Sequence, residues 1–150
     1  AQFIMFLREP LQQRMSRYFY IKKRINENKK RNHQGRPVTE LRFSNVDEFL
    51  LQETSFPFYS GEIPWKLTPE NYRETLDQHL VFIGISERLQ ESVNILANKL
   101  GKPKIEIPHR NAGTWDEEPA PETIEKFKTT HRLEYDIYDF ALERFSTQSL

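Results

Sequence analysis

Two residues that could bind a phosphate follow a short apolar run near the start of the chain. Arg8 comes directly after the run at 2–7, and Ser16 lies eight residues further on. If the run is a buried strand that leads into a helix, Arg8 marks the strand end and Ser16 lies just over two turns along the helix. A guanidinium binds phosphate bidentately, and a hydroxyl donates one further hydrogen bond. The same spacing also permits a simple ion pair between Arg8 and Glu9 or another acid, with Ser16 as an ordinary helix residue.

Other candidate residues lie in two charged regions. Residues 22–36 hold seven Lys/Arg and one Glu, and residues 116–143 hold nine Asp/Glu and three Lys/Arg. The basic stretch is typical of a solvated helix end, or of a surface that attracts an anionic acceptor or a nucleotide. His33, within it, is a weak candidate for a base. His109 and Arg110 form a basic pair in the loop 108–115, which is either a solvated turn or a phosphate-binding loop.

Two apolar runs position these residues. The runs at 2–7 and 80–85 are each followed by a helical pattern, the first from Pro10 to about Glu27 and the second capped by Ser86. This order predicts an α/β fold with a parallel sheet. Ligands of such sheets bind beyond the carboxyl ends of the strands, so we expect Arg8 and Ser86 at one edge.

Helical spacing predicts the remaining elements. We expect a short helix at 46–51 capped by Asn45 or Ser44, and a helix that begins at Thr68-Pro69 and ends near His79. The helix after the second strand should bury one leucine-rich face and end at Gly101. Two more helices are expected at 122–130 and about 133–145. The apolar positions assigned to these faces are Leu89, Val93, Leu96, Leu100, Leu133, Ile137, Tyr138, Ala141, Leu142 and Phe145.

Composition limits the class of protein. The 150 residues carry 22 Lys+Arg and 22 Asp+Glu, which argues against a general nucleic-acid binder, and the length suits a single domain over 1–150. There is no run of about 18 apolar residues to span a membrane. The absence of Cys excludes disulfides and thiolate chemistry, and favours a bacterial or cytoplasmic protein over one of the Golgi lumen. A chain that opens on a buried strand suggests that an N-terminal part is missing.

Three segments resemble one enzyme family. FIMFLREPLQQRMSRYFY (3–20) looks like the 3′-phosphate-binding segment of sulfotransferases that use 3′-phosphoadenosine 5′-phosphosulfate. FIGISERLQESVNIL (82–96) is similar to a strand–helix segment of their carbohydrate branch, which includes heparan sulfate 2-O-sulfotransferase. LEYDIYDFALERF (133–145) is like the helix that closes those domains, with Ile137 where Leu is usual. The order and spacing of the three segments agree with the family.

The resemblance implies a P-loop-like parallel sheet flanked by helices, with a helix-rich C-terminal part. It implies that Arg8 and Ser16 hold the 3′-phosphate of the nucleotide, and that His109 and Arg110 reach its phosphates. The reaction would transfer a sulfuryl group to an acceptor hydroxyl, expected on a carbohydrate, and release adenosine 3′,5′-bisphosphate. This chemistry needs no metal, and no His/Asp/Glu spacing indicates one.

The sequence departs from the family at its start. The family's phosphosulfate loop, a Pro-Lys-x-Gly/Ala-(Ser/Thr)-(Ser/Thr) type sequence, has no counterpart, because all five Gly are isolated and none precedes a Lys-Ser/Thr pair. The catalytic base would also lie upstream of Ala1. We therefore expect the carboxyl-terminal portion of a sulfotransferase, inactive alone. The alternative is a non-catalytic remnant domain that binds a partner or an anion.

Overall fold

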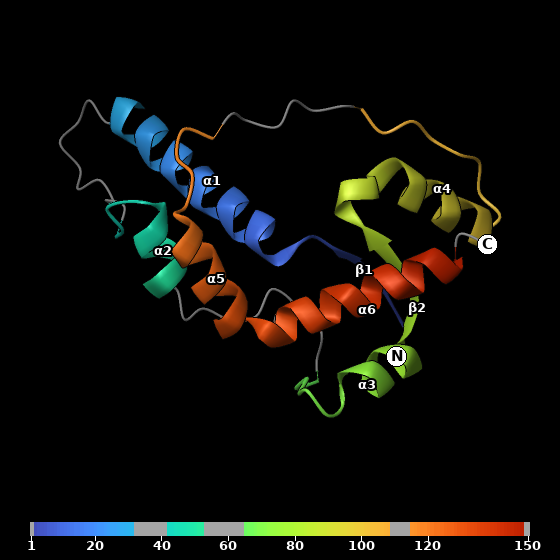
Figure 1. Cartoon of the computed structure of the whole chain (residues 1–150). Helices are drawn as coiled ribbons and strands as arrows, with labels where there is room; N and C mark the ends of the chain where they lie inside the picture. The colour runs from blue at the N-terminus through green and yellow to red at the C-terminus, as the bar shows by residue number, and fades with distance from the viewer. Residues whose placement is uncertain (1, 32–41, 53–64, 109–114, 149–150) are drawn as a thin grey trace. The chain divides into compact units, whose positions relative to one another are not determined.

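A computed structural model describes residues 2–31, 42–52, 65–108 and 115–148 of the chain (Figure 1). The chain divides into two compact units. We call the first the sheet unit; it comprises Ala1–Pro10, Phe56–Ala112 and His131–Leu150. The second, the helical unit, comprises Leu11–Ser55 and Gly113–Thr130. Each unit is described by itself.

In its described residues, the sheet unit contains two parallel strands. β1 (Phe3–Leu7) and β2 (Leu80–Ile85) pair with Met5 opposite Ile83 and Leu7 opposite Ile85. Around them lie α3 (Tyr72–His79), the 3₁₀ turn η1 (Ser86–Arg88), α4 (Leu89–Lys99) and α6 (Arg132–Gln148). Figure 1 shows α3 leading directly into β2 and α4 following it. The predicted α/β class with a parallel sheet is therefore confirmed at this level.

Apolar side chains from the strands and α6 form the core of the sheet unit. Met5 and Leu7 are two residues apart on β1, so their side chains point to the same side of the sheet. Ile137, Ala141 and Phe145 recur every four residues on α6 and are fully buried. The cluster also includes Leu67, Tyr72, Leu76, Leu80, Ile83, Ile85, Tyr138 and Phe140. The predicted Ile137, Tyr138, Ala141 and Phe145 are buried on α6, whereas the predicted Leu133 and Leu142 are only partly buried and Glu134 and Phe140 are buried without having been predicted.

A glycine permits close packing on the other face of the sheet. The ring of Phe6 lies against Gly84, where a β-carbon would come within 2.5 Å of a ring carbon. Phe6 also packs against Phe82, with ring centroids 5.9 Å apart. A side chain at position 84 would therefore force this ring to move.

Side chains close the outer edge of β2. The amide of Gln148 donates to the carbonyl of Ile83 (2.9 Å) and accepts from its N–H (3.2 Å). Ser92 Oγ makes the same pair of bonds with Ile85, at 2.9 and 3.1 Å. Lys99 Nζ donates to the carbonyl of Val81 (3.1 Å). The backbone groups that face away from β1 at residues 83 and 85 are thus satisfied without another strand.

The sequence predicts the C-terminal end of α4 correctly but not the start of α3. Gly101 has φ 63°, and the N–H groups of Gly101 and Lys102 bond to the carbonyls of Asn98 and Ala97, which is a Schellman motif. The predicted start of α3 at Thr68-Pro69 is wrong. Asn71 Oδ1 accepts from the Thr68 N–H (2.8 Å), and the resulting turn delays the helix until Tyr72.

The junction between β2 and α4 also departs from the expectation. Ser86 does not cap the helix, because η1 intervenes and the residue before α4 is Arg88, with no side-chain capping bond. The deeply buried positions of α4 are the small residues Ser92 and Ala97. Leu89 and Leu100, at its ends, are exposed. Small residues bring the helix close enough to β2 for Ser92 to bond to it.

The helical unit contains three helices in its described part: α1 (Pro10–Arg31, which enters from the sheet unit at Pro10), α2 (Val46–Gln52) and α5 (Pro121–Thr130). Tyr18 of α1 packs on Phe49 of α2, with ring centroids 5.2 Å apart. Asn45 caps α2 as predicted, because its Oδ1 accepts from the Glu48 N–H (2.9 Å).

Candidate functional site

The carboxyl edge of the sheet brings Arg8 and Ser86 together, as predicted. Both residues follow directly after the paired strand ends Leu7 and Ile85. The Arg8 side chain is 37% exposed, and its Nε lies 4.0 Å from Glu87 Oε1. The edge therefore presents a guanidinium that solvent can reach, next to a carboxylate.

Glu87 fastens this edge, a role that the sequence analysis missed. Its Oε1 accepts from the Glu9 N–H (2.9 Å), and its Oε2 accepts from the Tyr138 hydroxyl (3.1 Å). It thereby joins the segments that follow both strands to α6. The pKa of Tyr138 is raised by burial and by the nearby Glu87 charge. The sequence did contain a signal for this role. If the two strands pair in parallel, Glu87 falls opposite Arg8 and Glu9, just beyond the strand ends.

A second carboxylate at the edge is also engaged. Tyr135 donates to Glu9 Oε1 at 2.6 Å, so α6 supplies a tyrosine to each of the two acids. The edge thus holds two carboxylates, each bonded to a tyrosine of α6, and one of them, Glu87, lies near Arg8. An anion that binds Arg8 must compete with Glu87, whose Oε1 lies 4.0 Å from the Arg8 Nε.

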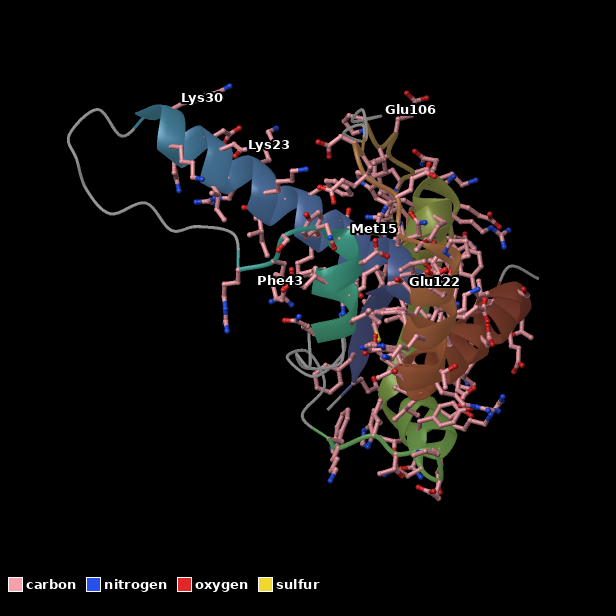
Figure 2. All side chains as sticks on the ribbon, turned by 60° about the vertical axis from the view of Figure 1, so that its left-hand side comes forward. Met15, Lys23, Lys30, Phe43, Glu106 and Glu122 are labelled. Carbon is pink, nitrogen blue, oxygen red and sulfur yellow. The ribbon has the colours of Figure 1, made fainter. Side chains whose placement is uncertain are left out.

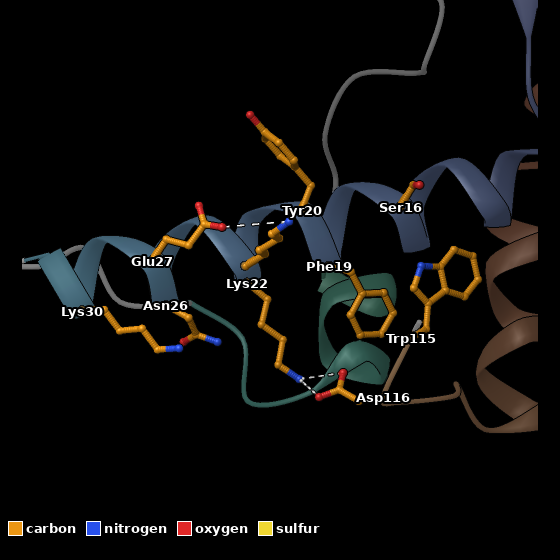
Figure 3. Close-up of a pocket in the computed structure, with 10 residues that line it drawn as sticks. Ser16, Phe19, Tyr20, Lys22, Asn26, Glu27, Lys30, Trp115 and Asp116 are labelled. Carbon is orange, nitrogen blue, oxygen red and sulfur yellow. Dashed lines mark hydrogen bonds and ion pairs between the residues drawn. The ribbon is translucent and has the colours of Figure 1, made fainter. Parts of the chain in front are cut away.

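Ser16 lines a pocket in the helical unit, between α1 and the segment around Trp115 (Figure 3). The pocket has a volume of about 650 Å³. The rings of Phe19 and Trp115 stack at 5.6 Å and 14°, and form an aromatic wall. The complete lining is Ser16, Phe19, Tyr20, Lys22, Lys23, Asn26, Glu27, Lys30, Trp115 and Asp116. This combination of aromatic rings, amide and lysines suits a ligand that has both a ring and an anionic group.

The base of the pocket is fixed by an ion-pair network. Lys22 Nζ donates to Glu117 Oε1 (2.6 Å) and to both oxygens of Asp116 (3.1 and 3.0 Å). Glu117 also accepts from the Tyr18 hydroxyl (3.2 Å) and from the Val46 N–H (3.0 Å). The network joins α1, the start of α2 and the segment before α5. Lys22 is thus neutralised, and it is a structural cation rather than a free anion ligand.

The charges of this network shift the pKa values of its members. Partial burial acts to raise the pKa of Glu117, but bonds from Lys22, Val46 and Tyr18 lower it overall. The pKa of Asp116 is lowered by its bond from Lys22. Burial and the Glu117 charge raise the pKa of Tyr18 to about 12. The two acids therefore stay ionised, and Tyr18 stays neutral, at neutral pH.

The exposed lysines of the pocket lie on the outer part of α1. Lys23 and Lys30 project from this part of the helix (Figure 2), and Lys23 lies 3.9 Å from Glu27. The basic stretch predicted at 22–36 is described only as far as residue 31. His33, His109 and Arg110 lie outside the described residues, so their roles stay predictions.

Arg8 and Ser16 belong to different units. Their convergence on one phosphate therefore also stays a prediction. Within the described ranges, no group of three or more His, Asp or Glu side chains is arranged to hold a metal ion. None of the helices in those ranges is both long and apolar enough to cross a membrane.

Comparison with known proteins returns no relative. No family model, no curated protein and no solved structure matches the chain. The resemblance to sulfotransferases thus rests on the three sequence segments alone.

Proposed function

We propose that the chain is the 3′-phosphate-binding, carboxyl-terminal portion of a sulfotransferase domain. The reaction would move the sulfuryl group of 3′-phosphoadenosine 5′-phosphosulfate to a hydroxyl of a carbohydrate acceptor. Arg8 and Ser16 would hold the 3′-phosphate of the donor, and of the product adenosine 3′,5′-bisphosphate. His109 and Arg110 would approach its phosphates from a loop.

One observation carries the proposal: β1 and β2 are parallel, and Arg8 and Ser86 follow them at one carboxyl edge. This is where parallel α/β sheets bind their ligands. Two of the segments that resemble the family thus meet where a nucleotide site is expected. The P-loop-like form of the whole domain, and its incompleteness at the N-terminus, are part of the proposal.

The described residues fit one end of the nucleotide. Arg8 offers a solvent-accessible guanidinium for a phosphate, and Ser16 lines a pocket. The described glycines do not form a cradle for the 5′ end, because Gly84 lies within β2 and Gly101 ends α4. The donor would supply the activated sulfuryl group. The share of this chain is to hold the 3′ end, so that the rest of the donor is fixed in position.

Phosphate recognition is tested by calorimetry with adenosine 3′,5′-bisphosphate and adenosine 5′-monophosphate. We expect the bisphosphate to bind more tightly than the monophosphate. Arg8→Ala should weaken binding of the bisphosphate by about 2–3 kcal/mol, as for the loss of a charge-assisted hydrogen bond. Arg73→Ala is the matched control, because Arg73 also carries one charge in the sheet unit but pairs with Glu143 on its surface. Equal loss in both variants would refute the assignment of Arg8.

Ser16 requires its own comparison. Ser16→Ala should weaken binding of the bisphosphate but not of the monophosphate, while Ser146→Ala should change the binding of neither. Ser146 is an exposed serine on α6 whose Oγ bonds to the Leu142 carbonyl. If only Arg8→Ala has an effect, Ser16 does not share the phosphate with Arg8.

Activity is expected to be absent from the 150-residue chain. Without a cradle for the phosphosulfate, nothing holds the transferring group in line or stabilises its charge. Loss of a general base alone costs roughly 10²–10⁴ in rate. Transfer of labelled sulfate to a mixed set of glycans and phenols is the assay. Measurable transfer by the purified chain would show that the catalytic residues lie within it, and His33 and His109 would be the first to mutate.

The alternative is a non-catalytic domain that binds an anion or a partner. The pocket beside Lys23 and Lys30 favours it, because that pocket lies on the most basic part of α1. Under this alternative, Lys30→Ala would weaken binding of the bisphosphate and Arg8→Ala would not. The genomic sequence upstream of Ala1 is a second discriminator, since it either encodes a Lys-x-Gly-(Ser/Thr)-(Ser/Thr) loop or does not.

A further inference from the structure

Arg8 and Glu87 present a positive and a negative group side by side at the carboxyl edge of the sheet. Both side chains are 37% exposed, and Arg8 Nε lies 4.0 Å from Glu87 Oε1. That separation is too long for a hydrogen bond between these two atoms. Because the two groups are adjacent and open to solvent, a single tetrahedral anion can reach both. Both residues belong to the sheet unit, so the pair is described without reference to the helical unit.

The carboxylate of Glu87 is held in place but can accept further hydrogen bonds. Its Oε1 accepts from the Glu9 N–H (2.9 Å), and its Oε2 accepts from the Tyr138 hydroxyl (3.1 Å). A carboxylate has about four lone-pair sites on its two oxygens, so these two bonds do not saturate it. Turning the carboxylate away from an anion at Arg8 would break both bonds. An anion that binds Arg8 therefore meets a fixed negative charge.

A fixed carboxylate beside a guanidinium treats phosphate and sulfate esters differently. A phosphate monoester loses its second proton with a pKa of about 6, so it can carry an O–H group, whereas a sulfate ester has no proton to lose. The protonated phosphate accepts from the guanidinium and donates its O–H to the carboxylate. The sulfate ester accepts from the guanidinium but sets its own charge against that of the carboxylate.

We propose that Glu87 makes the Arg8 site select a phosphate monoester against a sulfate ester, by accepting a hydrogen bond from the O–H of the phosphate. The inference rests on the proposed function, in which Arg8 binds the 3′-phosphate of the donor. That donor carries a phosphate monoester at one end and a sulfuryl group at the other. A site that attracts the first and repels the second holds the donor by the correct end.

Other charged groups at this edge are already engaged. Arg88 donates from Nε and from a terminal nitrogen to the two oxygens of Glu91, at 2.8 and 2.7 Å. Glu9 accepts from the Tyr135 hydroxyl at 2.6 Å. Burial and the Glu87 charge raise the pKa of Tyr138, which stays neutral. In the described part of this edge, the charged and titratable groups around Glu87 are Arg8, Glu9, Arg88, Tyr135, Tyr138 and Asp139.

Titration of the ¹⁵N-labelled full chain with methyl phosphate and methyl sulfate, followed by NMR, tests the selection. At about pH 5.5 most of each probe carries one negative charge, and only the phosphate carries a proton. The Arg8 Nε–H and Glu9 N–H signals report binding at this edge. The Nε–H of Arg73, which donates to the Tyr72 hydroxyl, is the internal control and should not move. We expect methyl phosphate to bind about tenfold more tightly, as for one further hydrogen bond.

Two variants that each remove one carboxylate charge locate the effect. Glu87→Gln should abolish the preference, mainly because methyl sulfate then binds more tightly, since the new amide can donate to either ester. Glu143→Gln is the matched control, because Glu143 also lies beside a guanidinium of the sheet unit, that of Arg73. It should keep the preference measured at Arg8.

The pH dependence gives a readout that a purely structural role of Glu87 would not change. In the original chain, methyl phosphate should bind more weakly at about pH 8 than at about pH 5.5, because it has lost the proton that Glu87 accepts. In Glu87→Gln it should bind more tightly at the higher pH, since the remaining guanidinium favours the dianion. Binding of methyl sulfate should change little with pH in both chains.

Each other result would overturn the proposal. Equal binding of the two probes, or a preference that survives Glu87→Gln, would show that Glu87 does not select. Loss of the preference in Glu9→Gln but not in Glu87→Gln would assign the proton acceptor to Glu9. Absence of binding at Arg8 would refute this proposal and the assignment of Arg8 together. If Glu87→Gln fails to fold, the pH dependence of the original chain decides.

The proposed function can fail separately. Selection of methyl phosphate through Glu87, without tighter binding of adenosine 3′,5′-bisphosphate than of the monophosphate, would leave the anion selection in place and refute the nucleotide. Tighter binding of the bisphosphate through Arg8, without any preference between the methyl esters, would do the reverse.

Discussion

The sheet unit and the helical unit rely on different interactions to join segments that are distant in the sequence. In the sheet unit, β1, β2 and α6 meet through buried apolar side chains such as Met5, Ile83 and Phe145. In the helical unit, α1, the start of α2 and the segment before α5 meet at one carboxylate, Glu117. Aromatic contacts support the same junction, because Tyr18 packs on Phe49 of α2 and Phe19 stacks on Trp115 in the segment before α5.

This difference has a physical consequence. Burial of apolar surface depends little on pH and salt, whereas an ion pair depends on both. Each unit contains one tryptophan, which reports on it separately. Trp65, in the sheet unit, stacks on His79 with centroids 3.9 Å apart. Trp115, in the helical unit, stacks on Phe19. Replacing either tryptophan by Phe leaves a fluorescence probe for the other unit.

The largest expected effect comes from the core of the sheet unit. Phe145→Ala should lower the free energy of unfolding by about 3–5 kcal/mol, because it removes a fully buried ring and leaves a cavity. Urea titration followed at Trp65 measures the loss, which should be the same at pH 5 and pH 7. Leu100→Ala, at an exposed apolar position, is the control and should change little. A loss below about 1 kcal/mol for Phe145→Ala would contradict an apolar origin of the stability of this unit.

The next effect concerns the close contact in the sheet. Gly84→Ala should cost about 1–3 kcal/mol, because the new β-carbon would lie 2.5 Å from the ring of Phe6. If the contact is the cause, Phe6→Leu should make the alanine substitution less costly in the double variant. A double-mutant cycle at Trp65 measures this coupling. Additive losses would show that Phe6 does not determine the cost.

A smaller effect is expected at the polar centre of the helical unit. Glu117→Gln should cost about 1–2 kcal/mol, since it removes the charge that faces Lys22 and replaces one accepting oxygen with an NH2 group that cannot accept from Lys22 or Val46. Glu118→Gln, a neighbour with the same charge change, is the control. The loss should be visible at Trp115 and should shrink in high salt. An effect seen equally at Trp65 would mean that the two units do not unfold separately.

The same network predicts a dependence on acid. The pKa values of Glu117 and Asp116 are lowered in the folded chain. Their contribution to the stability of the helical unit is therefore complete above their ordinary pKa values of 4.5 and 3.8. It is lost as the pH falls through the lowered values, because the unfolded chain then binds more protons. Unfolding followed at Trp115 should become easier below about pH 4.5, and Glu117→Gln should reduce this dependence.

Sequence patterns predicted the elements better than the contacts between them. The runs at 2–7 and 80–85 indicated parallel strands, because apolar continuity and a following helix are local properties. Glu87 and Glu117 escaped prediction, because each is an ordinary acid until the fold brings donors to it. The donors to Glu117 come from 71 to 99 residues away in the chain. Local turn chemistry at Asn71 likewise overrode the helix start that Thr68-Pro69 suggested.

The smallest expected effect is at the start of α2. Asn45→Ala should cost about 1 kcal/mol, because its Oδ1 accepts the Glu48 N–H and a short helix of seven residues depends on its cap. Asn45→Asp retains the acceptor and should preserve stability. The loss should be seen at Trp115 and not at Trp65. The bond from the Glu48 N–H involves no charged group, so the loss of stability caused by Asn45→Ala should persist at pH 4. At that pH the loss caused by Glu117→Gln has begun to decrease. A loss for Asn45→Ala that followed the same pH dependence would mean that the cap acts through Glu117 and is not an independent support of the unit.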